Sequence, residues 1–588
     1  MSSSPELAPP SAVPTEPAAD KPYCNIVMKG GITSGVVYPR AVAELAEKYR
    51  FKNVGGTSAG AIAAGLAAAA EFGRARGGFA RMLEYAGRTN RILLTLFQPA
   101  PCLRPLFHAL LAALGGKPWC LKLATILIRL VYGYWLASLL GGLLAGAVAL
   151  AACGLVTGQV VWPALGAAAL GVPLAVAWRV GRALVHDLPR QFYGLCPGTT
   201  QPGSERHQPA LTDWLADVLD SVADVQGLAG RPPDQPLTFG DLHGGNSADP
   251  AIRLLVMTTN LTEGRPYRLP FEDRKFLFRP DEFRRLFPPR IVDWMVKKSD
   301  EFSRDPGYRY LPEPDDLPVI VAVRMSLSFP VLLAAVPLHA RDFRQPDEAE
   351  QQRPRPQWFS DGGISSNFPI HFFDAIWPRW PTFGVKLEAF DPQVHRDQRI
   401  DLPRKAGHGL LLPFRHIGSL GQFLGAMLDA MQEWRENLQT VLPGYRERIV
   451  HVRLAEYEGG LNLNMPPEII DQLSDYGRQA GQMLRTDFDW DAHRWRRYLV
   501  AVARLEEMLD DLGQSYTQAA PGDEPLKSFL ERYRDDPAEY EQTGQWNAAA
   551  EQDVEDLMRC HALWLARKRL QEGRIPKPSA ELRMTPRV

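Results

Sequence analysis

The pentapeptide GTSAG at residues 56–60 constrains the fold more than any other part of the sequence. A short apolar stretch at residues 51–54 precedes it and predicts a β-strand, and the alanine-rich run that begins at Ala59 predicts a helix. Strand, tight turn and helix in this order place Ser58 at a helix N-terminus, where a developing negative charge is favoured. Gly56 and Gly60 allow the close backbone approach that such a turn needs. We therefore expect the turn to present Ser58 as a nucleophile.

A glycine loop at Gly30 and Gly31 lies upstream, after an apolar strand pattern at residues 25–28 and before helical spacing at residues 36–49. Strand, glycine loop, helix, strand, serine turn and helix make one βαβ unit, which places both loops at the carboxyl ends of two adjacent parallel strands. The backbone N–H groups of Gly30 and Gly31 could then point at an oxyanion.

A third motif, far downstream, is Asp361 followed by Gly362 and Gly363, at the end of a short predicted strand within residues 358–369. On its own, Asp-Gly most often marks a plain turn. A nucleophilic serine needs a base, however, and a carboxylate at the end of a neighbouring strand can accept its proton directly.

Together the three motifs resemble the patatin-like phospholipase family, over about residues 22–95 and 250–390. The matching positions are Gly30, Gly31, Gly56, Ser58, Gly60, Asp361, Gly362, Gly363, Asn367 and Pro369. The resemblance implies an α/β fold, a three-layer sheet with flanking helices. It also implies a Ser–Asp dyad without histidine, in which Ser58 is the nucleophile and Asp361 the base. The N–H groups of Gly30 and Gly31 would form the oxyanion hole, and the reaction would need no metal or organic cofactor.

The glycine loop departs from the family pattern of three glycines followed by a basic residue. Ile32 replaces the third glycine and Ser34 stands at the basic position. It stays open which N–H groups bind the oxyanion, and whether Lys29 or Arg40 supplies the missing charge. The sequence of residues 28–39 resembles that of a bacterial patatin-related subgroup with a long C-terminal extension. Residues 323–337 resemble the family's small-residue helix.

Two other functions compete with this prediction. The chain order Ser58, Asp361, His371 also fits the triad of an α/β-hydrolase, but that fold places several strands before its serine turn. Here only one clear strand and one helix precede the strand that leads into the turn. The altered Gly30-Gly31-Ile32 loop motivates the second alternative, a membrane-anchored regulatory or binding protein on a hydrolase scaffold with weak or no activity.

Residues 130–178 contain no charged side chain and divide into apolar segments at 132–153 and 160–178. Each segment is close to the about 20 residues that span a bilayer. Aromatic residues lie at the edges, basic residues flank both ends, and Gly142 and Gly146 form a small-xxx-small pair for close helix contact. We predict a transmembrane hairpin in the cell (inner) membrane with the catalytic domain cytoplasmic. A buried hairpin in a soluble domain or at an oligomer interface is the alternative.

Length and composition set the remaining expectations. A chain of 588 residues exceeds one simple core. We expect a disordered tail at 1–21, a catalytic core at 22–120 and 191–455, the hairpin insertion at 121–190, and a helical C-terminal extension at 456–588. The formal charge of -1 argues against nucleic acid as a partner. Six scattered cysteines without a C-x-x-C pattern support neither zinc nor a disulfide scaffold.

These features predict a membrane phospholipid or another acyl-ester lipid as the substrate. They do not indicate an oligomeric state.

Overall fold

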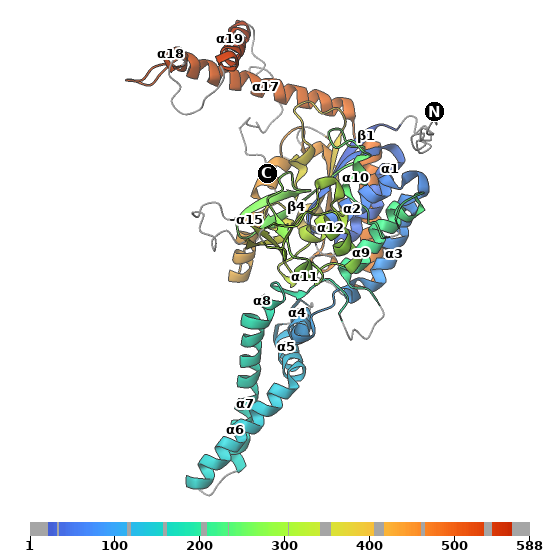
Figure 1. The fold of residues 1–588 in the computed structure, drawn as a ribbon, viewed down its shortest axis with the longest axis vertical. Helices are drawn as coiled ribbons and strands as arrows, with labels where there is room; N and C mark the ends of the chain where they lie inside the picture. Colours follow the sequence, from blue (N-terminus) through green and yellow to red (C-terminus); the bar gives the residue numbers. More distant parts are fainter. Residues whose placement is uncertain are drawn as a thin grey trace, which may run out of the picture.

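The computed structural model describes residues 21–566, with gaps at 32–33, 115–118, 157–160, 202–207, 233, 304, 342–353, 405–416, 460–464 and 534–543. The tail predicted at residues 1–21 therefore lies almost wholly outside the described residues. Figure 1 shows a central body with a helical arm at one end and a second group of helices at the other.

A large mixed sheet forms the centre of the body, and it confirms the predicted α/β class. Within the described residues the sheet has eleven strands. In order across the sheet they are β12 (Ile400–Asp401), β13 (Ile449–Leu454), β11 (Thr382–Ala389), β1 (Tyr23–Met28), β2 (Arg50–Gly56), β4 (Arg253–Asn260), β10 (Arg355–Asp361), β9 (Val336–Ala340), β6 (Leu277–Phe278) and β7 (Arg309–Tyr310), with β5 (Arg265–Leu269) beside β4.

The predicted βαβ unit is present at the start of the chain. Strands β1 and β2 are parallel neighbours, α1 (Tyr38–Lys48) connects them, and α2 (Ala59–Phe72) follows β2. Helix α2 is buried on almost every side, because it packs between the sheet and the helices α3 (Gly78–Leu96) and α9 (Leu211–Ala223). Its alanines permit this close packing.

Strand β4 brings the ends of two other strands, β2 and β10, together. Its residue Val256 pairs with Gly56 of β2 on one side and with β5 on the other. Two residues further on, Thr258 pairs with β5 again and with Asp361 of β10. A strand has only two edges, so β10 occupies the edge of β4 that β2 has left. The two strands therefore meet end to end.

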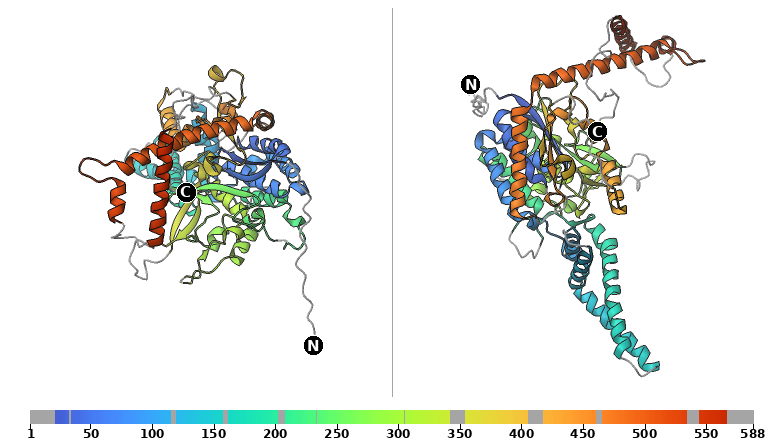
Figure 2. Two further views of the ribbon diagram at one scale, coloured as in Figure 1. Left: turned by 90° about the horizontal axis from the view of Figure 1, so that it is seen from above. Right: turned by 180° about the vertical axis from the view of Figure 1, so that it is seen from behind.

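A helical hairpin is inserted between α3 and the later strands, and it projects from the body as a long arm (Figures 1 and 2). It consists of α6 (Trp135–Val156) and α7 (Val161–Arg182). The chain reaches it through α4 (Arg104–Leu114) and α5 (Trp119–Gly133), and returns through α8 (Leu188–Arg190) and β3 (Gly194–Cys196). Strand β3 pairs with β8 (Val331–Leu333) in a separate two-stranded sheet.

Among the described glycines of the two hairpin helices, Gly141 and Gly171 come closest to the facing helix. A Cβ atom on Gly141 would lie 2.3 Å from Ala175 Cβ, and one on Gly171 would lie 2.4 Å from the Gly141 carbonyl oxygen. The predicted pair Gly142 and Gly146 is less crowded, with nearest distances of 3.2 and 3.5 Å. The tightest contact therefore involves Gly141, one residue before the pair that the sequence indicated.

The described part of the predicted C-terminal extension is mainly helical, with α16 (Pro467–Asp487), α17 (Trp490–Thr517), α18 (Leu526–Tyr533) and α19 (Gly544–Leu565). Helix α16 packs so closely on the start of α1 that a Cβ atom on Gly477 would lie 1.9 Å from the Val37 carbonyl oxygen. Helices α17 to α19 extend beyond the body at the end opposite the hairpin (Figure 2). Residues 518–525, which include Pro521, Gly522 and Pro525, separate α17 from α18.

Candidate active site

Ser58 lies on a strained turn between β2 and α2. It is the N-cap residue of α2 and has φ of 54° and ψ of -129°, a conformation that side-chain-bearing residues rarely adopt. The flanking glycines are sterically required. A Cβ atom would lie 2.3 Å from the Gly60 carbonyl oxygen if added to Gly56, and 2.3 Å from the Met28 carbonyl oxygen if added to Gly60. Both motif glycines thus let the turn close.

The backbone of this turn is held by a residue from another element. The Ser58 N–H donates to Ser326 Oγ at 3.1 Å. Ser326 is the last residue of α13 (Val319–Ser326) and is fully buried. The small-residue helix predicted at 323–337 ends earlier than expected, at Ser326. Residues 331–333 and 336–340 instead form β8 and β9.

Asp361 is the last residue of β10, and its side chain is buried near the serine turn. Its N–H donates to the Ser328 carbonyl oxygen at 3.0 Å, and its Oδ1 accepts a hydrogen bond from the Gly363 N–H at 2.7 Å. Its Oδ2 is buried and has no partner at standard hydrogen-bond geometry among the described residues. Glycine is required next to it, because a Cβ atom on Gly362 would lie 2.0 Å from the Met257 carbonyl oxygen.

The environment of Asp361 changes its acidity. Burial raises the pKa of Asp361 to about 7, and the nearby Ser58 side chain and the Gly363 amide, which favour the ionised form, offset part of that shift. A carboxyl group that titrates near neutral pH beside a serine hydroxyl has the acidity that a general base requires.

The glycine loop contacts the serine turn directly, but the Gly30 amide is occupied. The Gly30 N–H donates to the Asn367 carbonyl oxygen at 2.8 Å, and Thr57 Oγ1 donates to the same oxygen at 2.9 Å. A Cβ atom on Gly30 would lie 2.2 Å from Asn367 Oδ1 and 3.1 Å from Ser58 Cβ. The N–H of Gly31, which is partly exposed, donates to no acceptor among the described residues.

The two basic residues that the sequence singled out differ in exposure. Lys29 is buried at the end of β1, whereas Arg40 is exposed on α1. His371, the histidine of the alternative triad, lies in a 3₁₀ turn (Ile370–Phe373), and its ring packs edge-on against Phe372. The two groups that lower the pKa of Asp361 are the Ser58 side chain and the Gly363 amide.

Several residues of the site could not be assigned a role from sequence. Thr259 Oγ1 donates to the Asp361 carbonyl oxygen at 2.9 Å, and Thr258 Oγ1 donates to the Ser360 carbonyl oxygen at 2.8 Å. Both threonines hold β10 against β4. The sequence marked Ser326 and Ser328 only as small residues, and nothing in the local pattern indicated that they would contact Ser58 and Asp361.

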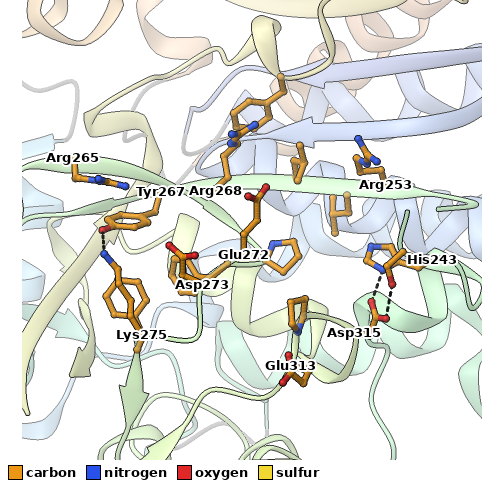
Figure 3. A pocket seen from close by; sticks show the side chains of 18 residues that line it. His243, Arg253, Arg265, Tyr267, Arg268, Glu272, Asp273, Lys275, Glu313 and Asp315 are labelled. Atoms are coloured by element: carbon orange, nitrogen blue, oxygen red, sulfur yellow. Dashed lines mark hydrogen bonds and ion pairs between the residues drawn. The ribbon is translucent and has the colours of Figure 1, made fainter. Parts of the chain in front are cut away.

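A pocket of about 720 Å³ opens beside the first residues of β4 and along β5 (Figure 3). Neither Ser58 nor Asp361 lines it. Its charged lining is balanced, and one wall carries a hydrogen bond of 2.6 Å between His243 Nδ1 and Asp315 Oδ1. The basic and acidic lining residues are Arg253, Arg265, Arg268 and Lys275, and Glu272, Asp273, Glu313 and Asp315.

The described residues contain no cluster of His, Cys, Asp or Glu side chains that could hold a metal ion.

Comparisons with known proteins identify the family of the chain. The family model for patatin-like phospholipases matches residues 26–106. The chain is 37% identical over 593 residues to the RpoH suppressor of Rhizobium meliloti (strain 1021), with 88% of this chain and 91% of that protein covered.

Two solved structures are distant neighbours. One is the type III effector protein ExoU, with a TM-score of 0.27, 13% identity, and coverage of 92% of this chain and 76% of that one. The other is the ExoU–SpcU complex of Pseudomonas aeruginosa, with a TM-score of 0.19, 15% identity, and coverage of 91% and 71%. On the family match, and on the strand, serine turn and helix that fall within the matched residues, the chain belongs to the patatin-like phospholipase family.

Proposed function

We propose that the protein is a serine acyl-ester hydrolase of membrane lipids that uses Ser58 and Asp361 as a catalytic dyad. The observation that carries the proposal is the position of a buried carboxyl with a pKa near 7 beside a serine on a strained turn. Such strain needs support from the surrounding fold, and it is concentrated in proteins at functional sites.

The reaction follows from these two groups. The Asp361 carboxylate accepts the Ser58 hydroxyl proton while Oγ attacks the acyl carbonyl carbon of the ester. The tetrahedral intermediate collapses, and the proton passes to the departing alcohol or lysolipid. A water molecule then gives a proton to Asp361 and attacks the acyl-enzyme, which releases the fatty acid and restores the Ser58 hydroxyl.

The negative charge on the carbonyl oxygen needs N–H donors. The Gly30 N–H is engaged by the Asn367 carbonyl oxygen, so we assign the oxyanion hole to the N–H of Gly31 and to the first amide of α2, at Ala59. The first amides of a helix have no intrahelical acceptor, and they lie at the positive end of its dipole. Gly30 remains the residue whose lack of a side chain lets the loop contact Ser58.

We further propose that α6 and α7 cross a membrane and hold the catalytic domain at its cytoplasmic side. The apolar stretches Trp135–Ala152, in α6, and Val161–Arg190, which runs from α7 through α8, are each only 17% buried. A core helix of a soluble protein would be mostly buried. Many leucines on the two helices are more than half exposed: Leu136, Leu140, Leu143, Leu144, Leu165, Leu170 and Leu174. Such an anchor would keep the active site near lipid esters.

A second function has one observation in its favour. The Gly30 N–H is already bonded to the Asn367 carbonyl oxygen, so one of the expected oxyanion donors is lost. This loss would fit a regulatory or binding protein that keeps the scaffold and has weak or no activity.

Product analysis distinguishes the two. The full-length protein, purified in detergent, is incubated with a panel of phospholipids, lysolipids and neutral glycerides, and released fatty acids are quantified against a Ser58→Ala control. Release by the wild-type chain alone supports the hydrolase and identifies its substrate class. If the two proteins release equal amounts from every lipid, the binding function is favoured.

A further inference from the structure

Arg324 is a fully buried arginine without an acidic partner among the described residues. It lies in α13, two residues before Ser326. Its guanidinium donates to Ser328 Oγ at 2.6 Å, to the Pro197 carbonyl oxygen at 3.0 Å and to the Ala334 carbonyl oxygen at 2.9 Å. An uncompensated buried charge is costly, and an apolar side chain of similar size would often be tolerated better.

One acceptor, Ser328, lies just after α13, in a turn that accepts hydrogen bonds from the backbone N–H groups of both candidate catalytic residues. Ser328, whose Oγ accepts from Arg324, also accepts the Asp361 N–H and the Ser360 hydroxyl with its carbonyl oxygen, at 3.0 and 2.9 Å. Ser326, on the same turn, accepts the Ser58 N–H with its hydroxyl. The turn from Arg324 to Ser328 thus contacts the nucleophile on one side and the base on the other.

The other two acceptors come directly after the two strands of the small sheet through which the chain returns from the hairpin. Pro197 follows β3, the strand on which the chain returns from α7 and α8, and Ala334 follows β8. Backbone strain is concentrated at this junction: Phe192 and Tyr193 before β3 and Val331 in β8 all have positive φ, between 53° and 68°. Such conformations persist only where the surroundings enforce them, above all for a β-branched residue.

We propose that Arg324 is a positioning residue, which joins the return segment of the hairpin to the turn that sets the distance between Ser58 and Asp361. This inference rests on the proposed hydrolase function. Arg324 touches neither the ester nor the reacting atoms, so its contribution is geometric. A small displacement of the turn would move Asp361 relative to Ser58 Oγ without removing either of the two reacting groups.

The test uses Arg324→Lys, which keeps the charge, and Arg324→Met, which keeps the apolar stem. The matched control is Arg448→Lys, because Arg448 is also buried and donates to the Thr382 carbonyl oxygen and to Asp374, away from the dyad. Turnover of a soluble short-chain p-nitrophenyl ester is measured per folded molecule, well below each variant's melting temperature. We expect kcat of both Arg324 variants to fall about 10- to 100-fold with KM within twofold of wild type, since displacements near 1 Å can cost about 100-fold.

Equal kcat in the Arg324 variants and wild type, or equal losses in Arg324→Lys and Arg448→Lys, would overturn the positioning role. If neither Arg324 variant folds, Ser328→Ala replaces them, because it removes one Arg324 acceptor and keeps the carbonyl that binds Asp361. A fall of kcat of at least threefold at constant KM in Ser328→Ala supports the role, and wild-type kcat refutes it. A wild-type protein that is itself inactive on every ester overturns the proposed function, and with it this inference.

Discussion

Gly56 and Asp361 are the last residues of two strands that meet end to end along one edge of β4. Gly56 pairs with Val256 and Asp361 pairs with Thr258, so the two strand ends are separated by two residues of β4. Two residues of a strand span about 6.6–6.8 Å. Because Ser58 lies two residues after Gly56, on the turn into α2, this meeting places the serine and the carboxyl group on the same short stretch of the sheet.

The pH dependence of acylation should report the titration of Asp361. The carboxyl group must be ionised to accept the Ser58 proton, and its pKa is about 7. We expect kcat/KM for a soluble ester to rise with pH around a midpoint of about 7 and then to level off. Stopped-flow or steady-state rates between pH 5 and 9, in buffers of constant ionic strength, check this. A rate that is already maximal at about pH 5 would contradict the assignment of Asp361 as the base.

Asp361 should also cost the protein stability at high pH. Its pKa is about 7 in the folded protein and about 4 in an unfolded chain. The folded state therefore binds the proton more tightly, and stability is lost as the pH rises from about 4 to about 7. At pH 8 we expect Asp361→Asn to unfold at a higher temperature than wild type. Its free energy of unfolding should be larger by an amount on the order of a few kcal/mol.

The control is the same comparison of Asp361→Asn with wild type, repeated at low pH. Below about pH 4 the wild-type carboxyl is protonated in both states, so the advantage of Asp361→Asn should disappear there. An advantage that is equal at low and high pH would show that the substitution acts through packing and not through the charge.

The serine turn should not tolerate a methyl group at Gly60. In Gly60→Ala the new Cβ would lie 2.3 Å from the Met28 carbonyl oxygen, a backbone atom that cannot move without displacing β1. We expect a loss of about 1–3 kcal/mol or more in the free energy of unfolding, and little remaining activity. Gly87→Ala is the matched control: its Cβ would meet nothing within 4 Å inside α3, so we expect a gain of roughly 0.5–1 kcal/mol. Equal denaturation midpoints for the two variants would contradict the close approach.

The parts that could be predicted from the sequence are those that depend on local patterns. The strand, serine turn and helix around Ser58 are contiguous, and strands β4, β11 and β13 lie at the apolar runs at 251–258, 383–387 and 449–454. The Asp-Gly-Gly motif could be paired with Ser58 only through a family resemblance, because their convergence depends on the antiparallel register of β10 on β4.

Other features depend on contacts that a single sequence does not encode locally. The short strands β5 to β9 and the two-stranded sheet owe their pairing to distant partners. Arg324 reads as an ordinary helix-end arginine, and only the fold reveals that it is buried. In the hairpin, the predicted Gly142 and Gly146 both face α7, and Gly141 comes closer still to the facing helix, at Gly171.

The hairpin prediction can be tested by accessibility in intact cells. In a chain whose six native cysteines are replaced, a single cysteine is placed at Thr157, between α6 and α7 in the sequence, or at the exposed Ser528 of α18. If the hairpin crosses the membrane, an impermeant thiol reagent added outside labels the first and not the second. No labelling at residue 157, together with a protein that stays in solution after lysis without detergent, would indicate a soluble or interface hairpin instead.

The central claim, that Ser58 is the nucleophile and Asp361 its base, is tested most directly by a fluorophosphonate probe with mass-spectrometric identification of the modified residue. The probe labels only an activated serine. We predict one modification, at Ser58 in the wild-type chain. We predict none in Ser58→Ala and at least a 100-fold slower labelling rate in Asp361→Asn, with His371→Ala near wild type. Since the dyad acts as a unit, the double variant should hydrolyse esters little more slowly than either single one. Modification of another serine, or wild-type labelling in Asp361→Asn, would contradict it.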